Sequence, residues 1–247
     1  MITHKTFGIL PMAGRGSRIQ PIGFSKELYP TIHKGRHYAI SEFTIMAMKK
    51  AGVDEIKIVT SPSKKDIADY YSQSNYNPIS IYFFDSPSLP ESCLFPIDGL
   101  HDNDICLFGL PDTLFFPSNG FKKIKQSILN GADITLGLFH VDDGSLYDSV
   151  LLDKDNNVKK VLVKKKPPLS NLIWGIWGAK VGTLKKLRTI ISRQKANGEK
   201  LLGTGFNCLA DHKEIKFKGV HVGKKYFDIG TMDKVVKANS IIKNFSL

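Results

Sequence analysis

The chain has 247 residues, with 35 lysine and arginine residues against 23 aspartate and glutamate residues, so its formal net charge at pH 7 is +12. Hydrophobic residues make up 42% and charged residues 23% of the sequence, a balance that excludes a disordered tail protein and a collagen-like chain. A chain of this length buries roughly three quarters of its unfolded surface, so its core needs neither disulfides nor a structural metal.

The first 140 residues alternate short apolar runs with amphipathic stretches, which is the pattern of βαβ units around a mostly parallel sheet. We predict strands at residues 7–12, 56–60, 79–84, 105–110 and 134–139. The run 105–110 is apolar throughout, so we expect a central strand buried on both faces. We predict helices at 39–51 and 121–129, and a third helix that carries Ile67 and Tyr70 and is capped by Ser63.

The pattern changes after residue 142. Runs at 150–152 and 158–163 flank the turn-rich segment 153–157 and predict a β-hairpin. A further strand is predicted at 172–179, followed by helices at 184–195 and 232–243. We find no linker that divides the chain and expect one α/β domain.

The cysteines and the apolar runs of the sequence indicate the cellular compartment of the protein. Cys93, Cys106 and Cys208 are widely spaced and form no CxxC pair, so neither a disulfide framework nor a zinc site is indicated. No apolar signal segment follows residues 1–6, and no apolar run approaches the roughly 18 residues that a membrane span needs. We therefore expect a soluble protein of the cytoplasm.

The positive charge lies in short runs of lysine and arginine at 122–125, 159–160, 164–166, 185–188 and 224–225. Such runs are usually solvated faces, and the alternative is an anionic substrate or partner. No run is interleaved with the aromatic residues that stack on nucleic-acid bases. We therefore do not expect a nucleic-acid partner.

The first predicted strand opens into a loop that contains Gly14 and Gly16. Glycines let backbone N–H groups approach phosphate oxygens closely, and Arg18 and Lys26 add positive charge beside them. The loop is not a dinucleotide fingerprint, because Ile19 stands where the third glycine would be. From these residues alone, a phosphate-binding loop and a plain structural turn both remain open.

Four segments in order resemble the signature of the sugar-1-phosphate nucleotidylyltransferases. They are GRGSR at 14–18 with the lysine of SKELYP at 25–30, PDTLF at 111–115, KKKP at 164–167 and FDIGT at 227–231. The resemblance implies a Rossmann-like, mostly parallel sheet flanked by helices. It divides the chain into a nucleotide-binding part of about 1–140, a small sugar-side β insertion at about 141–225 and a final helix at about 231–244.

The resemblance implies transfer of a nucleotidyl group from a nucleoside triphosphate, dTTP or UTP, to a sugar 1-phosphate. Pyrophosphate is released, and the product is a nucleotide-sugar of the kind used for cell-surface polysaccharides. The resemblance implies dependence on Mg²⁺. The relatives commonly form homo-oligomers, but no residue of this sequence indicates an interface.

The resemblance also assigns roles to individual residues. Arg18 and Lys26 stabilise the triphosphate and the departing pyrophosphate, and Asp112 and Asp228 bind Mg²⁺. The nucleotide-binding residues are Met12, Ala13, Gly14, Gly16, Ser17 and Pro90. The sugar-phosphate-binding residues are Lys166 and Gly175.

The chemistry agrees with these roles. Attack of a sugar phosphate on the α-phosphorus gathers negative charges in one cleft, so cations must offset their repulsion. Mg²⁺ takes few carboxylates and keeps phosphate and water as its other ligands. Asp112 follows the predicted central strand, at the edge where ligands bind in open α/β sheets. Taken singly, Asp112 and Asp228 also fit turn or capping residues, and Lys166 fits a solvated charge.

Several positions depart from the family pattern. Lys165 replaces a glutamate that contacts the sugar, and Asp148 replaces a glycine of the sugar-side hairpin. Phe84 and the segment 89–91 replace the base-recognition residues, and 203–205 replaces an acidic residue. The resemblance therefore identifies neither the sugar nor the base.

Two other functions remain open from the sequence. One is a nucleotide or nucleotide-sugar sensor, or an inactive subunit of an active partner, on the same scaffold. The other is a nicotinamide dehydrogenase that uses Gly14 and Gly16. It is the weaker alternative, because the predicted strand 56–60 ends in no acidic residue for the ribose hydroxyls.

Overall fold

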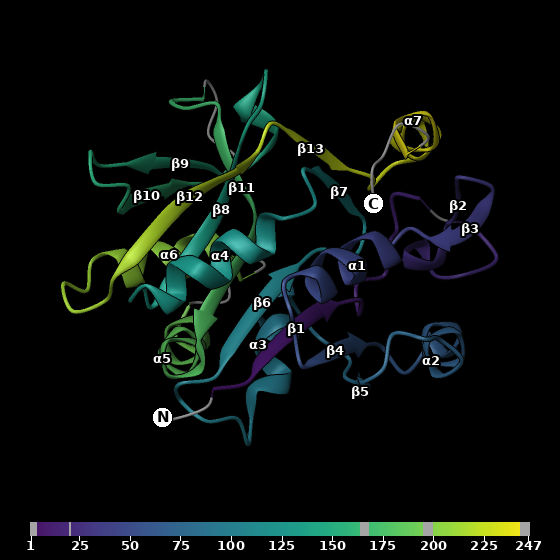
Figure 1. The fold of residues 1–247 in the computed structure, drawn as a ribbon, viewed down its shortest axis with the longest axis horizontal. Helices are drawn as coiled ribbons and strands as arrows, with labels where there is room; N and C mark the ends of the chain where they lie inside the picture. The colour runs from purple at the N-terminus through teal and green to yellow at the C-terminus, as the bar shows by residue number, and fades with distance from the viewer. Residues whose placement is uncertain (1–3, 20, 164–167, 195–199, 243–247) are drawn as a thin grey trace.

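A nine-stranded sheet runs through the molecule, with helices on both of its faces (Figure 1). The computed structural model describes residues 4–19, 21–163, 168–194 and 200–242. The parallel part of the sheet consists of β6 (Ile105–Gly109), β1 (Thr6–Pro11), β4 (Glu55–Thr60) and β5 (Ile79–Phe83), in this spatial order. All residues of β1 and β6 are buried, so these are the central strands that their continuous apolar runs predict.

Beyond β6 the sheet is mixed. Its strands are β8 (Ile134–His140), β9 (Ser149–Leu152), β10 (Val158–Leu162), β11 (Leu172–Lys180) and β12 (Phe217–Gly223). Most strand pairs are antiparallel, but β12 pairs parallel with β8. Strand β11 pairs antiparallel with β6 and β8, and the predicted hairpin forms from β9 and β10. The predicted α/β fold with a parallel core and a β insertion on one side is therefore confirmed.

Two apolar cores cover the faces of the sheet. One face packs against α3 (Leu89–Leu94), α5 (Val181–Ser192) and α6 (Leu202–Ala210). The other packs against α1 (Glu42–Lys50), α2 (Lys65–Ser72) and α4 (Gly120–Leu129). The last helix, α7 (Met232–Ile242), lies beside the ribbon of β2 (Pro30–His33) and β3 (Arg36–Ala39), where His33 Nδ1 and the Ile242 carbonyl are 2.8 Å apart.

Three predicted helix starts were wrong. The helix predicted from residue 39 begins at Glu42, because residues 36–39 pair with β2. Ser63 does not cap α2: the capping position is Lys64, and the Ser63 hydroxyl lies 2.9 Å from that of Ser61. The helix predicted from residue 184 begins at Val181, because β-branched and glycine residues in its first turn do not show a helical pattern.

Helix α6 was not predicted, because glycines argue against a helix interior. The structure gives their packing role. A Cβ on Gly205 would lie 2.7 Å from Ile191 of α5, and one on Gly203 would lie 2.8 Å from Val163. Both distances are shorter than a carbon–carbon contact allows, so close helix packing requires glycine at these positions.

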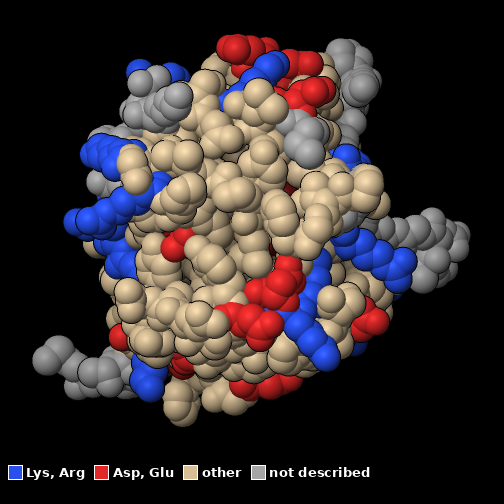
Figure 2. All heavy atoms as spheres, turned by 90° about the vertical axis from the view of Figure 1, so that its right-hand side faces the viewer, with Lys and Arg blue, Asp and Glu red and all other residues tan. Residues whose placement is uncertain are grey.

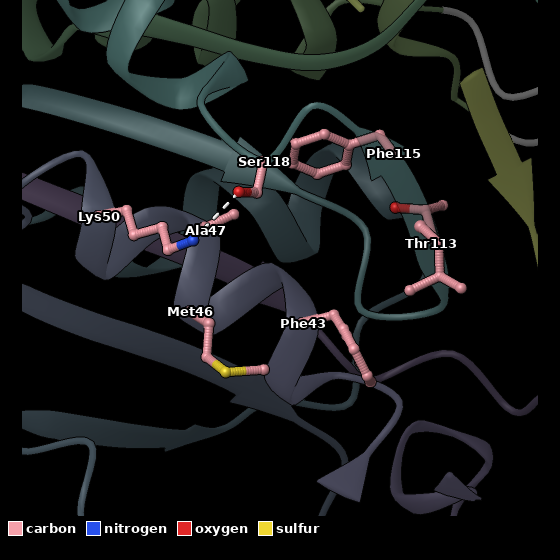
Figure 3. A pocket seen from close by; sticks show the side chains of 8 residues that line it. Phe43, Met46, Ala47, Lys50, Thr113, Phe115 and Ser118 are labelled. Atoms are coloured by element: carbon pink, nitrogen blue, oxygen red, sulfur yellow. Dashed lines mark hydrogen bonds between the residues drawn. The ribbon is translucent and has the colours of Figure 1, made fainter. Parts of the chain in front are cut away.

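Two four-residue strands form a separate ribbon, β7 (Thr113–Phe116) with β13 (Lys225–Asp228). Figure 1 shows β13 leading from β12 toward α7. A shallow pocket lies between β7 and α1, lined by Thr113 and Phe43 among others (Figure 3). At one side of it the Lys50 ammonium donates a 3.3 Å hydrogen bond to Ser118.

The surface charge is divided into separate groups. On the face shown in Figure 2, several lysine and arginine side chains form a group along the left edge, and others lie beside acidic side chains near the centre. Within the part of the chain that the structure describes, no helix is long and apolar enough to cross a membrane.

The corner between β12 and β13 requires Gly223. A Cβ at this position would lie 2.0 Å from the Phe116 carbonyl oxygen. We expect Gly223→Ala to lower the free energy of unfolding by about 1–3 kcal/mol, as overpacking does, measured by urea denaturation. Gly23→Ala is the control, because no atom lies within 4 Å of its added Cβ. Equal stability of the two variants would contradict this prediction.

Candidate functional site

Strand pairing brings the two predicted metal-binding aspartates together. Asp228, the last residue of β13, pairs with Thr113, the first residue of β7. Asp112 directly precedes Thr113, and its carbonyl accepts a 2.9 Å hydrogen bond from the Ile229 amide. The middle and the end of the chain therefore supply two carboxylates to one edge of the fold.

Lys26 joins this pair from the beginning of the chain. It starts a 3₁₀ turn, Lys26–Leu28, and its ammonium lies 2.5 Å from Asp112 Oδ2. Its hydrocarbon stem passes under Gly16, where an added Cβ would lie 3.1 Å from Lys26 Cδ. Burial lowers the pKa of Lys26, but the charge and hydrogen bond of Asp112 outweigh it, so the pKa is raised. The Lys26 ammonium is therefore held in its charged form.

Asp228 also has cationic and backbone partners. Its Oδ1 accepts a 3.0 Å hydrogen bond from the Gly230 amide, and its Oδ2 accepts one of 3.1 Å from Lys234 in α7. A Cβ at Gly230 would lie 3.0 Å both from Asp228 Oδ1 and from a guanidinium nitrogen of Arg18. Gly230 therefore leaves room for Arg18 and Asp228 to approach each other.

The glycine-rich loop borders this charged cluster. Met12 and Ala13 are buried at the end of β1, whereas Gly14, Ser17 and Arg18 are exposed. Gly16 has a φ of +64°, a left-handed conformation that favours glycine. The predicted loop thus presents an accessible backbone next to Lys26 and Arg18.

An apolar pocket lies over the sheet and extends to Leu110, two residues before Asp112. It is lined by Pro11, Leu89, Cys93, Phe108, Gly109, Leu110, Trp174, Gly175, Trp177 and Leu202. Gly175 is required here, because an added Cβ would lie 2.2 Å from the Tyr226 ring. Burial raises the pKa of Tyr226 well above its ordinary value, and the nearby Asp228 and Asp112 carboxylates raise it further. The Tyr226 phenol therefore stays neutral beside the charged cluster.

Two other predicted residues are not part of this cluster in the described structure. Pro90 is buried in the first turn of α3, next to the pocket residue Leu89. Lys166 and the neighbouring Lys165 lie outside the described residues. Phe84, which replaces a base-recognition residue, stacks on Phe95 with ring centroids 4.2 Å apart.

The two carboxylates fit the requirements of Mg²⁺. This ion binds through one or two carboxylates and completes its shell with phosphate and water. Asp112 and Asp228 fit that requirement, since Asp228 ends β13 and Asp112 directly precedes Thr113, the residue with which Asp228 pairs. Among the described residues, no group of three or more histidine, cysteine, aspartate or glutamate side chains could form a larger metal site.

Three contributors to this region were not predicted from the sequence. Lys234 binds Asp228, and the charge of Asp228 also acts on Tyr147. Lys64 binds the Glu27 carboxylate next to Lys26 at 2.9 Å. Lys234 lies six residues after the aspartate of FDIGT, a spacing that could have suggested it. No sequence signal identifies Lys64.

Comparison with known proteins gives one curated relative. It is a bifunctional sugar-1-phosphate nucleotidylyltransferase/acetyltransferase from Sulfurisphaera tokodaii, 26% identical over 233 residues. The alignment covers 92% of this chain and 53% of that protein, so the chain spans about half the length of its relative. No model of a known protein family matches the sequence.

Solved structures share the fold over nearly the whole chain. A Bacillus anthracis protein assigned as a glucose-1-phosphate thymidylyltransferase, in complex with sucrose, has a TM-score of 0.83 at 19% identity, with 98% of this chain and 97% of that chain covered. UTP-bound UGPase from Acinetobacter baumannii has a TM-score of 0.78 at 18% identity, covering 97% and 93%. The resemblance predicted from the sequence is therefore confirmed: the chain is similar to sugar-1-phosphate nucleotidylyltransferases in sequence and in fold.

Proposed function

We propose that this protein transfers a nucleotidyl group from a nucleoside triphosphate to a sugar 1-phosphate and releases pyrophosphate. One observation carries the proposal. The β7–β13 ribbon places Asp112 and Asp228 together, and Lys26 and Arg18 reach them from the glycine-rich loop region. This arrangement unites carboxylates for a divalent cation with cations for a triphosphate.

In the proposed reaction, an ionised phosphate oxygen of the sugar 1-phosphate attacks the α-phosphorus of the triphosphate. The bond between the α-phosphorus and the bridging oxygen to the β-phosphorus breaks, and pyrophosphate leaves with the electron pair. The attacking oxygen is already ionised, so no general base is needed. Lys26 and Arg18 stabilise the charge on the transferred and departing phosphates, which is the principal task in phosphoryl-type transfer.

Asp112 and Asp228 would hold Mg²⁺, which supplies charge neutralisation and a template for the phosphate oxygens when bound. Lys26 and Lys234 neutralise these carboxylates in the structure. The two lysines therefore offset the mutual repulsion of the aspartates before substrates arrive.

For the nucleotide we propose dTTP or UTP. Support comes from the structural neighbours, one assigned as a thymidylyltransferase and one solved with UTP. A protein that only binds these ligands is the less favoured alternative, because both carboxylates and both cations are retained.

The carboxylate of Asp112 is the first target for mutation. We expect Asp112→Asn to nearly abolish pyrophosphate release while the far-ultraviolet circular dichroism stays unchanged, because the amide keeps the shape but loses the charge. Asp98→Asn is the matched control, since Asp98 pairs with Arg188 on the surface. Full activity of Asp112→Asn in the presence of Mg²⁺ would contradict the assignment.

Lys26 tests the role of the fixed cation. If it stabilises the pyrophosphate in the transition state, Lys26→Ala should cost about 2–4 kcal/mol in kcat/KM. The measurement is pyrophosphate release with saturating sugar 1-phosphate and varied dTTP or UTP. Lys185→Ala is the control, because Lys185 forms an exposed pair with Asp102. A loss no larger than that of the control would rule out the proposed role.

A variant of Asp228 distinguishes the proposed enzyme from a sensor that only binds its ligand. For the enzyme, Asp228→Asn should remove turnover and weaken triphosphate binding in the presence of Mg²⁺. For a sensor, calorimetry should show ligand binding by the wild-type protein without product, and little change in the variant. The wild-type protein is tested with each triphosphate and a panel of sugar 1-phosphates, and absence of turnover with every pair would contradict the proposed function.

A further inference from the structure

A buried ion pair lies directly behind the candidate site. The Lys64 ammonium is 2.9 Å and 3.0 Å from the two carboxylate oxygens of Glu27. The side chains of Lys64 and Glu27 are 11% and 1% exposed. Burial raises the pKa of Glu27, while the charges of Lys64 and Lys26 oppose that rise. This pair has no assigned role in the proposed reaction.

The same ammonium also holds the start of the glycine-rich loop. It donates a 2.8 Å hydrogen bond to the Met12 carbonyl, at the end of β1. A lysine ammonium has three N–H donors, and these three contacts use all of them. Lys64 is therefore committed to protein atoms and has no donor left for a phosphate group.

Two residues at the beginning of α2 bind the neighbours of Lys26 in the sequence, one on each side. Lys64 binds Glu27, the residue after Lys26. Asp66 binds Ser25, the residue before Lys26. Its carboxylate accepts a 2.6 Å hydrogen bond from the Ser25 amide and a 2.8 Å hydrogen bond from the Ser25 hydroxyl. Lys26 lies between these two anchors, and its side chain runs under Gly16 to Asp112.

Stability alone does not account for an ion pair at this place. Two charges that leave water lose hydration, and a well-packed apolar pair of similar volume is often as stable or more so. An apolar pair, however, would form no directional bond to the Met12 carbonyl. The pair thus supplies geometry that packing alone does not provide.

We propose that Lys64 is a positioning residue for the transfer reaction. By binding Glu27 and Met12 with one ammonium, it fixes the turn that carries Lys26 against the glycine-rich loop. This inference rests on the proposed function, because the consequence of the fixed geometry is catalytic. A misplacement of about 1 Å at a distance from the reacting atoms is enough to lower a rate by about 100-fold.

The test is the double variant Lys64→Met/Glu27→Leu. It avoids the unpaired buried charge that either single variant would leave, and that charge could prevent folding. We expect kcat for pyrophosphate release to fall by about 100-fold, with a much smaller change in the KM for the triphosphate. We also expect faster amide hydrogen exchange in peptides covering residues 12–28, with a melting temperature within about 4 °C of the wild type.

Lys57→Met is the matched control. Lys57 is another buried lysine, 6% exposed on β4, but its ammonium donates to the Tyr82 hydroxyl at 2.7 Å instead of to the loop. We expect this variant to keep kcat and the exchange rate of residues 12–28. The proposal is overturned if the double variant keeps the wild-type kcat, if only its KM for the triphosphate rises, or if exchange of residues 12–28 is unchanged.

The exchange measurement separates this proposal from the proposed function. A wild-type protein without turnover for any substrate pair would contradict the transferase function. Faster exchange in the double variant and not in Lys57→Met would then still show that Lys64 orders the loop. Unchanged exchange in an active enzyme would overturn the role of Lys64 and leave the transferase function intact.

Discussion

The pairing of β7 with β13 is the constraint on which the candidate site depends. Asp112 and Asp228 are distant in sequence, so the pairing of this ribbon brings them together. Two adjacent carboxylates repel each other. Here Lys26 compensates one of them and Lys234 the other. Strand pairing and charge pairing are therefore interdependent at this edge.

The contact between Lys26 and Asp112 has a consequence for the order of events in the proposed reaction. Lys26 cannot stabilise a phosphate with full effect while its ammonium is held by Asp112 at 2.5 Å. An arriving triphosphate would offer Lys26 a new anionic partner, and a divalent cation would offer one to Asp112. If both partners exchanged together, neither charge would be left unpaired in the partly buried site. The ion pair would then be the form of the site before substrates bind.

The sequence predicted the parts of the fold that rest on continuous patterns. Long apolar runs identified β1 and β6, and the glycines of the loop together with Asp112 were found by residue type and position. The four-residue strands β7 and β13 are too short to show a period, and α6 contains glycines that its packing requires but that a helix pattern disfavours. The Lys64–Glu27 pair could not be predicted, because a sequence gives no sign that two charged side chains are buried together.

Two positions that depart from the family pattern, Asp148 and Gly203, lie close together in the structure. Asp148 stands where the family has a glycine, and Gly203 lies in the segment where relatives have an acidic residue. In the structure a Cβ on Gly203 would lie only 3.2 Å from Asp148 Oδ2. An acidic side chain at position 203 would therefore collide with Asp148 and repel its charge. The glycine at position 203 therefore leaves room for the Asp148 carboxylate beside α6.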